Sequence, residues 1–165
     1  MSPVTTRIPS LGPRGEGWLA AQFVLLALIG ALGFAELAGH GLASPWGTPA
    51  LAMGIVLAGF GLALGARAIH DLGSALSPFP KPLAAAPLIE TGAFRWIRHP
   101  IYTGLLLAAT GWGLAAGSLP ALAATVALAL VLDAKSRREE SWLLAAHPGY
   151  AAYRRRTRRF VPLLY

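Results

Sequence analysis

Residues 18–39 of the chain read WLAAQFVLLALIGALGFAELAG, an apolar run whose only charged side chain is Glu36. A helix needs about 20 apolar residues to cross the hydrocarbon core of a bilayer, so this run predicts a membrane span. A signal peptide, with Ala43 as the small residue before its cleavage site, is the alternative interpretation. We favour the span because the apolar part of a signal peptide has only about 7–15 residues.

A second apolar run covers residues 48–69 and predicts a second span. The short loop between the two runs, HGLASPWG at 40–47, contains no Lys or Arg. Gly61 and Gly65 have the G-x-x-x-G spacing that allows two membrane helices to approach closely.

The third apolar stretch, residues 101–132, is interrupted by GSLP at 117–120, which indicates a helical hairpin with Pro120 in the first turn of its second helix. Two complete spans need about 40 residues, more than this stretch provides. The second helix must therefore carry Asp133 and Lys135 into its inner turn, or the hairpin does not cross the membrane completely.

These runs predict an all-α polytopic membrane protein. The chain is 55% hydrophobic and only 13% charged, whereas soluble domains have about 25% charged residues. The same composition excludes intrinsic disorder. We expect a cytoplasmic lead-in at 1–17 and one membrane domain at 18–165. Its four spans are expected at 18–39, 48–69, 101–118 and 119–135, followed by an interfacial helical region at 136–165.

The positive charges predict the orientation of the spans. All 14 Lys and Arg residues lie within residues 1–17, 67–98 and 135–159, and the net charge is +7. Cytoplasmic loops of membrane proteins are enriched in Lys and Arg, so both termini are expected in the cytoplasm, and we expect the membrane to be the inner (plasma) membrane of a bacterium. We attribute the basic charge to contact with membrane lipids and expect no nucleic-acid partner.

Polar residues of unusual type gather before the third span. Pro100 lacks an N–H group and suits a first helical turn, so Arg98 and His99 are expected at the positive end of that helix. Such an end can bind a carboxylate or a phosphate. His99, Tyr102 and Thr103 would share one helix face. Local chemistry alone leaves open that Arg98 only reaches lipid headgroups and that His99 only caps the helix.

Acidic residues provide a second candidate. In one interpretation, Glu139 and Glu140 are a solvated pair that forms salt bridges with Arg137 or Arg138. In the other, a carboxylate of this pair accepts hydrogen bonds from ribose hydroxyls or holds a cation near the third helix. Glu36 is a functional candidate because it lies within a span, although it could also reach the interface. With no cysteine and four scattered histidines, we expect no metal site.

The region from Gly92 to Gly104 contains Arg-His-Pro-x-Tyr-x-Gly at 98–104, and Glu139-Glu140, Tyr150-x-x-Tyr153 and the closing RFVP at 159–162 follow one hairpin later. In order and spacing this set resembles the isoprenylcysteine carboxyl methyltransferase and phospholipid methyltransferase family of integral membrane enzymes. The resemblance covers roughly residues 86–162.

The resemblance implies S-adenosylmethionine as methyl donor, bound in a cytosol-facing pocket formed by the C-terminal helices and loops. Glu139 is the favoured member of the acidic pair for cofactor contact, with Glu140 one position away. Lys135 falls near the substrate-side Arg of the eukaryotic carboxyl methyltransferases. The implied cofactor residues are Ala86, Pro87, Leu88, Ile89, Phe94, Arg98, His99, Pro100, Ile101, Tyr102, Glu139 and Glu140.

The expected function is therefore transfer of a methyl group to a membrane-embedded amphiphile, either an isoprenylcysteine-like carboxylate or a lipid, with no catalytic residue assigned. Two alternatives stay open: a membrane reductase that uses a nicotinamide cofactor, and a small non-catalytic membrane protein. The sequence gives neither the acceptor atom nor the oligomeric state.

Overall fold

A computed structural model describes residues 8–41, 45–83 and 86–162. Within these ranges the fold is helical, and the extended backbone forms only an isolated bridge between Ile97 and Arg158. The predicted all-α membrane protein is confirmed. Its helices are α1 (Glu16–His40), α2 (Gly47–Leu72), α3 (Pro100–Ala116), α4 (Leu119–Ala146) and α5 (Tyr150–Arg156), with short 3-10 turns η1 (Gly73–Ala75) and η2 (Gly92–Arg95) between α2 and α3.

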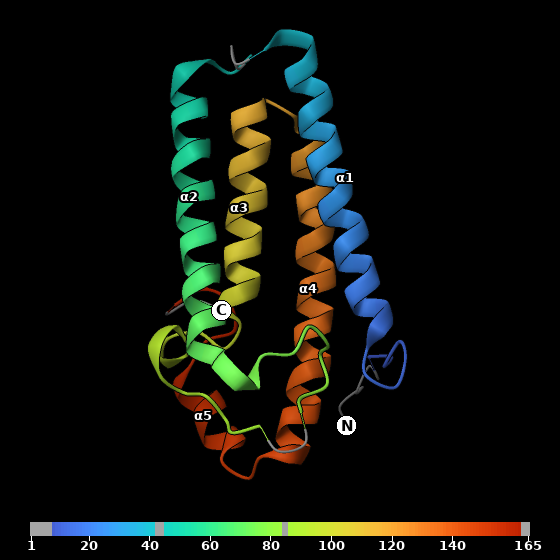
Figure 1. Ribbon diagram of the computed structural model, residues 1–165, viewed down its shortest axis with the longest axis vertical. Helices are drawn as coiled ribbons and strands as arrows, with labels where there is room; N and C mark the ends of the chain where they lie inside the picture. Colours follow the sequence, from blue (N-terminus) through green and yellow to red (C-terminus); the bar gives the residue numbers. More distant parts are fainter. Residues whose placement is uncertain (1–7, 42–44, 84–85, 163–165) are drawn as a thin grey trace, which may run out of the picture.

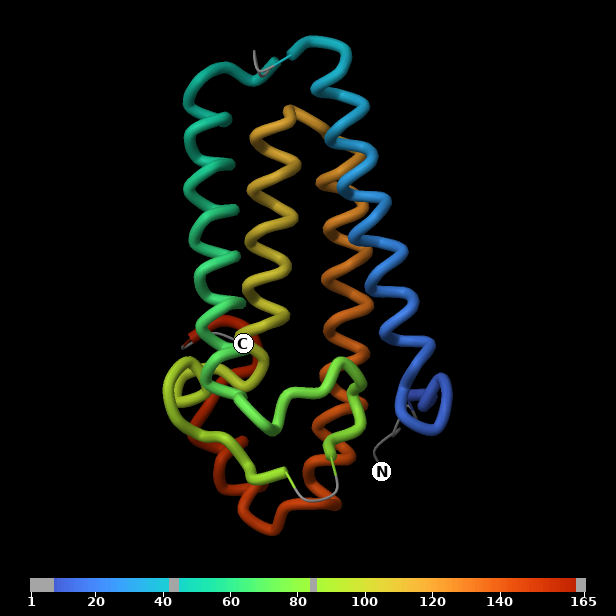
Figure 2. Tube along the Cα trace, in the orientation of Figure 1, coloured from blue at the N-terminus to red at the C-terminus, as the bar shows by residue number. Residues whose placement is uncertain are grey.

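Helices α1 to α4 run alternately up and down, and α3 and α4 lie between α2 and α1 (Figure 1). The α1–α2 and α3–α4 connections lie at one end. The segment between α2 and α3, together with α5 and the residues after it, gathers at the opposite end, as the trace in Figure 2 shows. We call this second end the loop end.

Three helices, α1, α2 and α4, are long and apolar enough to cross a membrane, and α3 is a shorter apolar helix of 17 residues. That length is near the lower limit of about 17 residues for a span. Pro100 is the first residue of α3, as predicted. Helix α4 does not end near residue 135 but continues to Ala146. No Gly or Pro interrupts SRREESWLLAA at 136–146, so nothing in this segment breaks the helix.

Glycines bring α2 and α3 into backbone contact. A Cβ atom built on Gly61 would lie 2.6 Å from the carbonyl oxygen of Gly104, and the reverse distance is also 2.6 Å. Gly54 meets Gly111 in the same way two turns further along. The glycines in contact are thus seven residues apart on each helix. Gly65 lies at the edge of this contact, where a Cβ on Gly104 would come within 2.9 Å of its nitrogen.

Helix α1 packs on α4 and α3. Ile29, Leu128 and Leu132 form part of the buried core, and the indole N–H of Trp112 donates to the carbonyl of Ile29 at 3.1 Å. Many large apolar side chains on the outer faces stay exposed, including Phe23, Val24, Phe34, Ile55, Val56, Phe60, Leu62, Val126 and Leu130. An apolar outer surface of this kind suits lipid rather than water.

The C-terminal segment anchors the start of α3. The backbone N–H of Arg98 donates to the carbonyl of Arg158 at 2.8 Å, and that of His99 donates to Arg159 at 3.1 Å. The Thr103 hydroxyl donates to the carbonyl of Phe160 at 2.9 Å. These bonds hold the segment before α3 and the end of the chain together, although they are about 60 residues apart in sequence.

Candidate functional site

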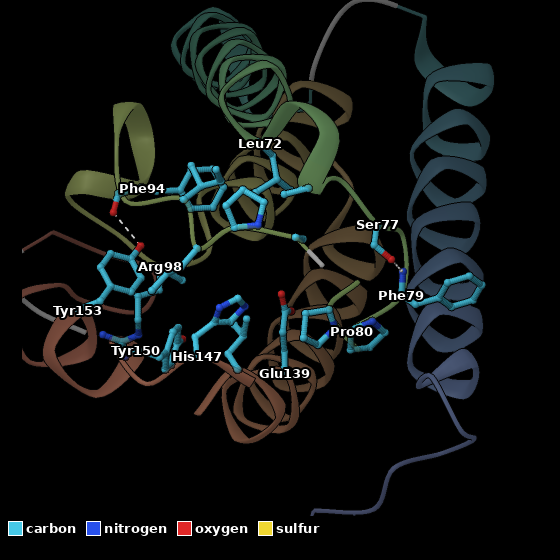
Figure 3. Close-up of a pocket in the computed structure, with 17 residues that line it drawn as sticks. Leu72, Ser77, Phe79, Pro80, Phe94, Arg98, Glu139, His147, Tyr150 and Tyr153 are labelled. Atoms are coloured by element: carbon cyan, nitrogen blue, oxygen red, sulfur yellow. Dashed lines mark hydrogen bonds between the residues drawn. The ribbon is translucent and has the colours of Figure 1, made fainter. Parts of the chain in front are cut away.

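Two adjoining cavities lie near the loop end. The first, which we call the loop cavity, is partly open to solvent and lies between the segment after α2 and the α4–α5 region (Figure 3); its empty space, open solvent included, is about 630 Å³. The second, the helix cavity, lies among α1 to α4 and has about 1000 Å³ of empty space, open solvent included. Five residues line both cavities and mark the junction between them: Leu72, Ser77, Phe94, Arg98 and Glu139.

The two cavities have different walls. Most of the loop cavity is lined by prolines, aliphatic residues and tyrosines: Pro80, Pro82, Pro87, Leu88, Ile89, Leu143, Tyr150 and Tyr153. The helix cavity has apolar walls contributed by helices of the bundle: Leu19, Phe23, Leu26, Ile69, Ile101 and Leu105. A mostly apolar cavity with a few polar groups is typical of small-molecule sites.

Arg98 is fixed by the protein. Its Nε donates to Glu140 at 2.8 Å, and one of its terminal nitrogens donates to the carbonyls of Thr157 at 2.6 Å and Arg154 at 3.2 Å. The guanidinium is almost completely buried. Arg98 therefore does not extend to lipid headgroups; it joins α4 to the C-terminal segment while lining both cavities.

Glu140 is the centre of a buried cluster of positive groups. Besides Arg98, it accepts from Arg159 Nε at 3.3 Å, and it lies 3.5 Å from Arg154 Nε. Its neighbour His99 has Nε2 3.3 Å away. The idea of a solvated pair with Arg137 or Arg138 is thus wrong for Glu140, which is 2% exposed. Burial would raise the pKa of Glu140, but the hydrogen bonds from His99, Arg98 and Arg159 outweigh this effect and hold it well below its usual range.

Glu139 points elsewhere. It lines both cavities, a quarter of its side chain is exposed, and it accepts a hydrogen bond from the Tyr102 hydroxyl at 2.8 Å. The Nδ1 of His99 lies 3.8 Å from it, so this imidazole stands between the two carboxylates. Successive helical residues point about 100° apart, which is why one carboxylate faces the cavities and the other faces the arginines.

Lys135 lies in the wall of the helix cavity. It is 1% exposed, and its ammonium donates to the side-chain oxygen of Gln22 at 2.6 Å. The same ammonium lies 5.0 Å from the centre of the Tyr102 ring. Gln22 was not identified from the sequence, although it is the one amide within the apolar run 18–39.

The remaining candidates divide between the cavities. Ala86, Pro87, Leu88 and Ile89 line the loop cavity together with Phe94. His99, Ile101 and Tyr102 line the helix cavity. Pro100 is buried at the start of α3 and is not among the residues that line either cavity. Glu36 lies in the last turns of α1, far along the helix from the cavities.

Several lining residues had not been assigned a site role from the sequence. They are Leu143, His147, Tyr150 and Tyr153 and the proline-rich segment 77–82. The Tyr153 hydroxyl donates to the carbonyl of Phe94 at 2.7 Å. The Tyr150 hydroxyl is buried and has no hydrogen-bond partner among the described residues.

A helix bundle with apolar outer faces, joined to a polar loop end that holds two adjoining cavities, defines an integral membrane protein with its cavities gathered at one end of the bundle. The chain belongs to the phospholipid methyltransferase family, whose family model matches residues 49–148. This match confirms the resemblance noted in the sequence.

The chain is also similar to the cobalt-zinc-cadmium resistance protein CzcN of Cupriavidus metallidurans. The two are 38% identical over 78 residues, which cover 47% of this chain and 36% of that protein. The match thus spans about a third of the length of this relative.

Proposed function

We propose that this protein transfers a methyl group from S-adenosylmethionine to a membrane-embedded amphiphile at the cytoplasmic face of a bacterial inner membrane. The observation that carries the proposal is the junction of the two cavities at Arg98 and Glu139. A polar donor and an apolar acceptor can occupy different cavities there and still meet.

The lining of the loop cavity fits the donor in chemistry. The carboxylate of Glu139 suits a cationic group, and apolar walls suit a flat base. When bound, the cofactor would supply an activated methyl group. We propose that the segment Ala86–Ile89, Phe94 and Glu139 hold it.

Other residues act by positioning Glu139. The Tyr102 hydroxyl fixes one carboxylate oxygen, and buried His99 separates Glu139 from Glu140. Transfer from a sulfonium needs orientation and exclusion of water rather than a protein nucleophile. A chain without cysteine can provide both.

The helix cavity suits the acceptor. Its apolar walls match a lipid or prenyl chain, and the ammonium of Lys135 beside Glu139 provides one cationic group for a polar head. Gln22 of α1 holds that ammonium in place. We propose that a membrane-dissolved acceptor enters this cavity from the bilayer, between the helices that line it. Both an isoprenylcysteine-like carboxylate and a lipid head group fit this description.

Ligand binding by the purified protein in detergent, measured by calorimetry, tests the proposal. We expect S-adenosylhomocysteine to bind and NADPH not to bind. Incubation with labelled S-adenosylmethionine and a bacterial lipid extract should then place the label in an extractable amphiphile identified by mass spectrometry. Binding of NADPH without binding of S-adenosylhomocysteine would instead favour the reductase, and binding of neither would contradict both enzymes.

A further inference from the structure

Tyr150, the first residue of α5, has an unsatisfied hydroxyl in the wall of the loop cavity. Its side chain is 1% exposed, and the oxygen has no hydrogen-bond partner among the described residues. Nearly all buried polar groups in native proteins have a partner, so an exception needs an explanation such as a ligand.

Tyr153 is the matched comparison. It lies one turn further along α5, and its ring is 5.7 Å from that of Tyr150. Both side chains line the cavity on its α4–α5 side, as Figure 3 shows. The Tyr153 hydroxyl is satisfied within the protein by the carbonyl of Phe94. The same short helix therefore satisfies one hydroxyl internally and leaves the other buried without a partner among the described residues.

The position of Tyr150 indicates which part of a donor it would contact. Methyl transfer must occur at the junction, where the two cavities share Arg98 and Glu139. Tyr150 lines the loop cavity and not the helix cavity, and the lining of the loop cavity includes the apolar residues Pro87, Leu88 and Leu143. A mostly apolar lining of this kind suits a flat base that needs few hydrogen bonds.

The hydroxyl also stays protonated. Burial raises the pKa of Tyr150 far above its ordinary value, and the negative charge of Glu140 raises it further. A neutral hydroxyl can both donate and accept, as ring nitrogens and ribose hydroxyls require.

We infer that the Tyr150 hydroxyl binds the adenosine half of the methyl donor by a hydrogen bond, an inference that rests on the proposed function. Tyr150 is a binding residue in this assignment and takes no part in the transfer itself.

The test compares two probes, S-adenosylhomocysteine and 5′-methylthioadenosine, which lacks the amino-acid half. Tyr150→Phe should weaken both by the same factor, about tenfold, because one hydrogen bond to the shared adenosine is lost. Without ligand, the melting temperature of the variant should not fall, since the hydroxyl has no partner to lose in the part of the chain that the structure describes.

Tyr153→Phe serves as the control. It removes a bond to the carbonyl of Phe94, so its melting temperature without ligand should fall. Unchanged affinity of Tyr150→Phe for both probes would overturn the inference, as would a loss confined to S-adenosylhomocysteine or a lower melting temperature without ligand. If the unmodified protein binds neither probe, the proposed function itself fails, and the two failures are thus distinguishable.

Discussion

At the scale of single residues, the site depends on two adjacent carboxylates with different surroundings. Glu140 is enclosed by Arg98, Arg159 and His99 and serves the structure. Glu139 is partly exposed and faces both cavities. One position along α4 thus separates a residue that holds the loop end together from a residue that can contact a ligand.

This difference predicts that replacing Glu139 mainly lowers ligand affinity, whereas replacing Glu140 mainly lowers stability. Glu139→Gln should reduce the affinity for S-adenosylhomocysteine at least tenfold, because a charge-assisted hydrogen bond contributes about 1.5–3 kcal/mol. Its melting temperature without ligand should change little. Calorimetry at two salt concentrations checks the result: a small loss that disappears at high salt would mean that Glu139 is only a surface charge.

Glu140→Gln should instead lower the melting temperature strongly. Removing one partner of a buried ion pair typically costs about 3–5 kcal/mol, because the remaining charges stay buried without compensation. Its affinity for S-adenosylhomocysteine, measured below the melting transition, should fall less than that of Glu139→Gln. A variant of Glu140 with normal stability would show that the arginine cluster does not depend on this carboxylate.

The same cluster predicts sensitivity to acid. Because the pKa of Glu140 is lower in the folded protein than its ordinary value of 4.5, its ionisation stabilises the fold above that pH. This contribution is lost as the pH falls below 4.5 toward the folded-state pKa. The melting temperature should therefore drop below this pH, and it should drop less in Glu140→Gln. Equal acid sensitivity in both proteins would assign the effect to other carboxylates.

At the scale of elements, the contact of α2 with α3 positions the start of α3, and with it His99 and Tyr102. The backbones touch at Gly61 and Gly104, whereas Gly59 on the outer side of α2 has nothing within 4 Å of its Cβ position. The two glycines on α2 are therefore a matched pair, one inside the contact and one outside it.

Gly61→Ala should destabilise the protein, since its Cβ would lie 2.6 Å from backbone atoms of α3 that cannot move independently. Overpacking of this kind costs about 1–3 kcal/mol. Gly59→Ala should be neutral or stabilising, because Ala favours a helix over Gly by about 0.5–1 kcal/mol. Melting curves in the same detergent compare the two, and similar curves would show that α2 and α3 are not tightly packed.

The sequence predicted most of these elements but not how they face one another. Length and apolar character predict the spans, and Pro100 marks the first residue of α3. The orientation of Glu139 relative to Glu140 depends on the rotation of α4, and the charged segment 133–140 has no apolar face that determines it. The hydrogen bond between Lys135 and Gln22 joins residues 113 positions apart. The sequence around each of the two residues does not indicate that the other is its partner.

At the scale of the whole molecule, the positive charges and the two cavities lie at the same end of the helix bundle. The described Lys and Arg residues lie in the segments at the loop end, where both cavities also lie. Glu36 and the α1–α2 and α3–α4 connections lie at the other end. A polar donor from the cytosol would thus reach the loop cavity only if the loop end faces the cytoplasm.

This orientation can be measured because the chain has no cysteine, so a single introduced cysteine reports its own position. Ala151→Cys on exposed α5 and Pro13→Cys before α1 should be protected from a membrane-impermeant maleimide in intact cells, whereas Thr48→Cys at the start of α2 should react. Translocating the loop end would carry most of the positive charge across the membrane, against the bias that keeps Lys and Arg inside.

All three cysteines should react after detergent treatment, which controls for local access. Reaction of Ala151→Cys in intact cells would place the loop cavity outside the cytoplasm, away from the supply of S-adenosylmethionine, and the proposed function would then require another donor.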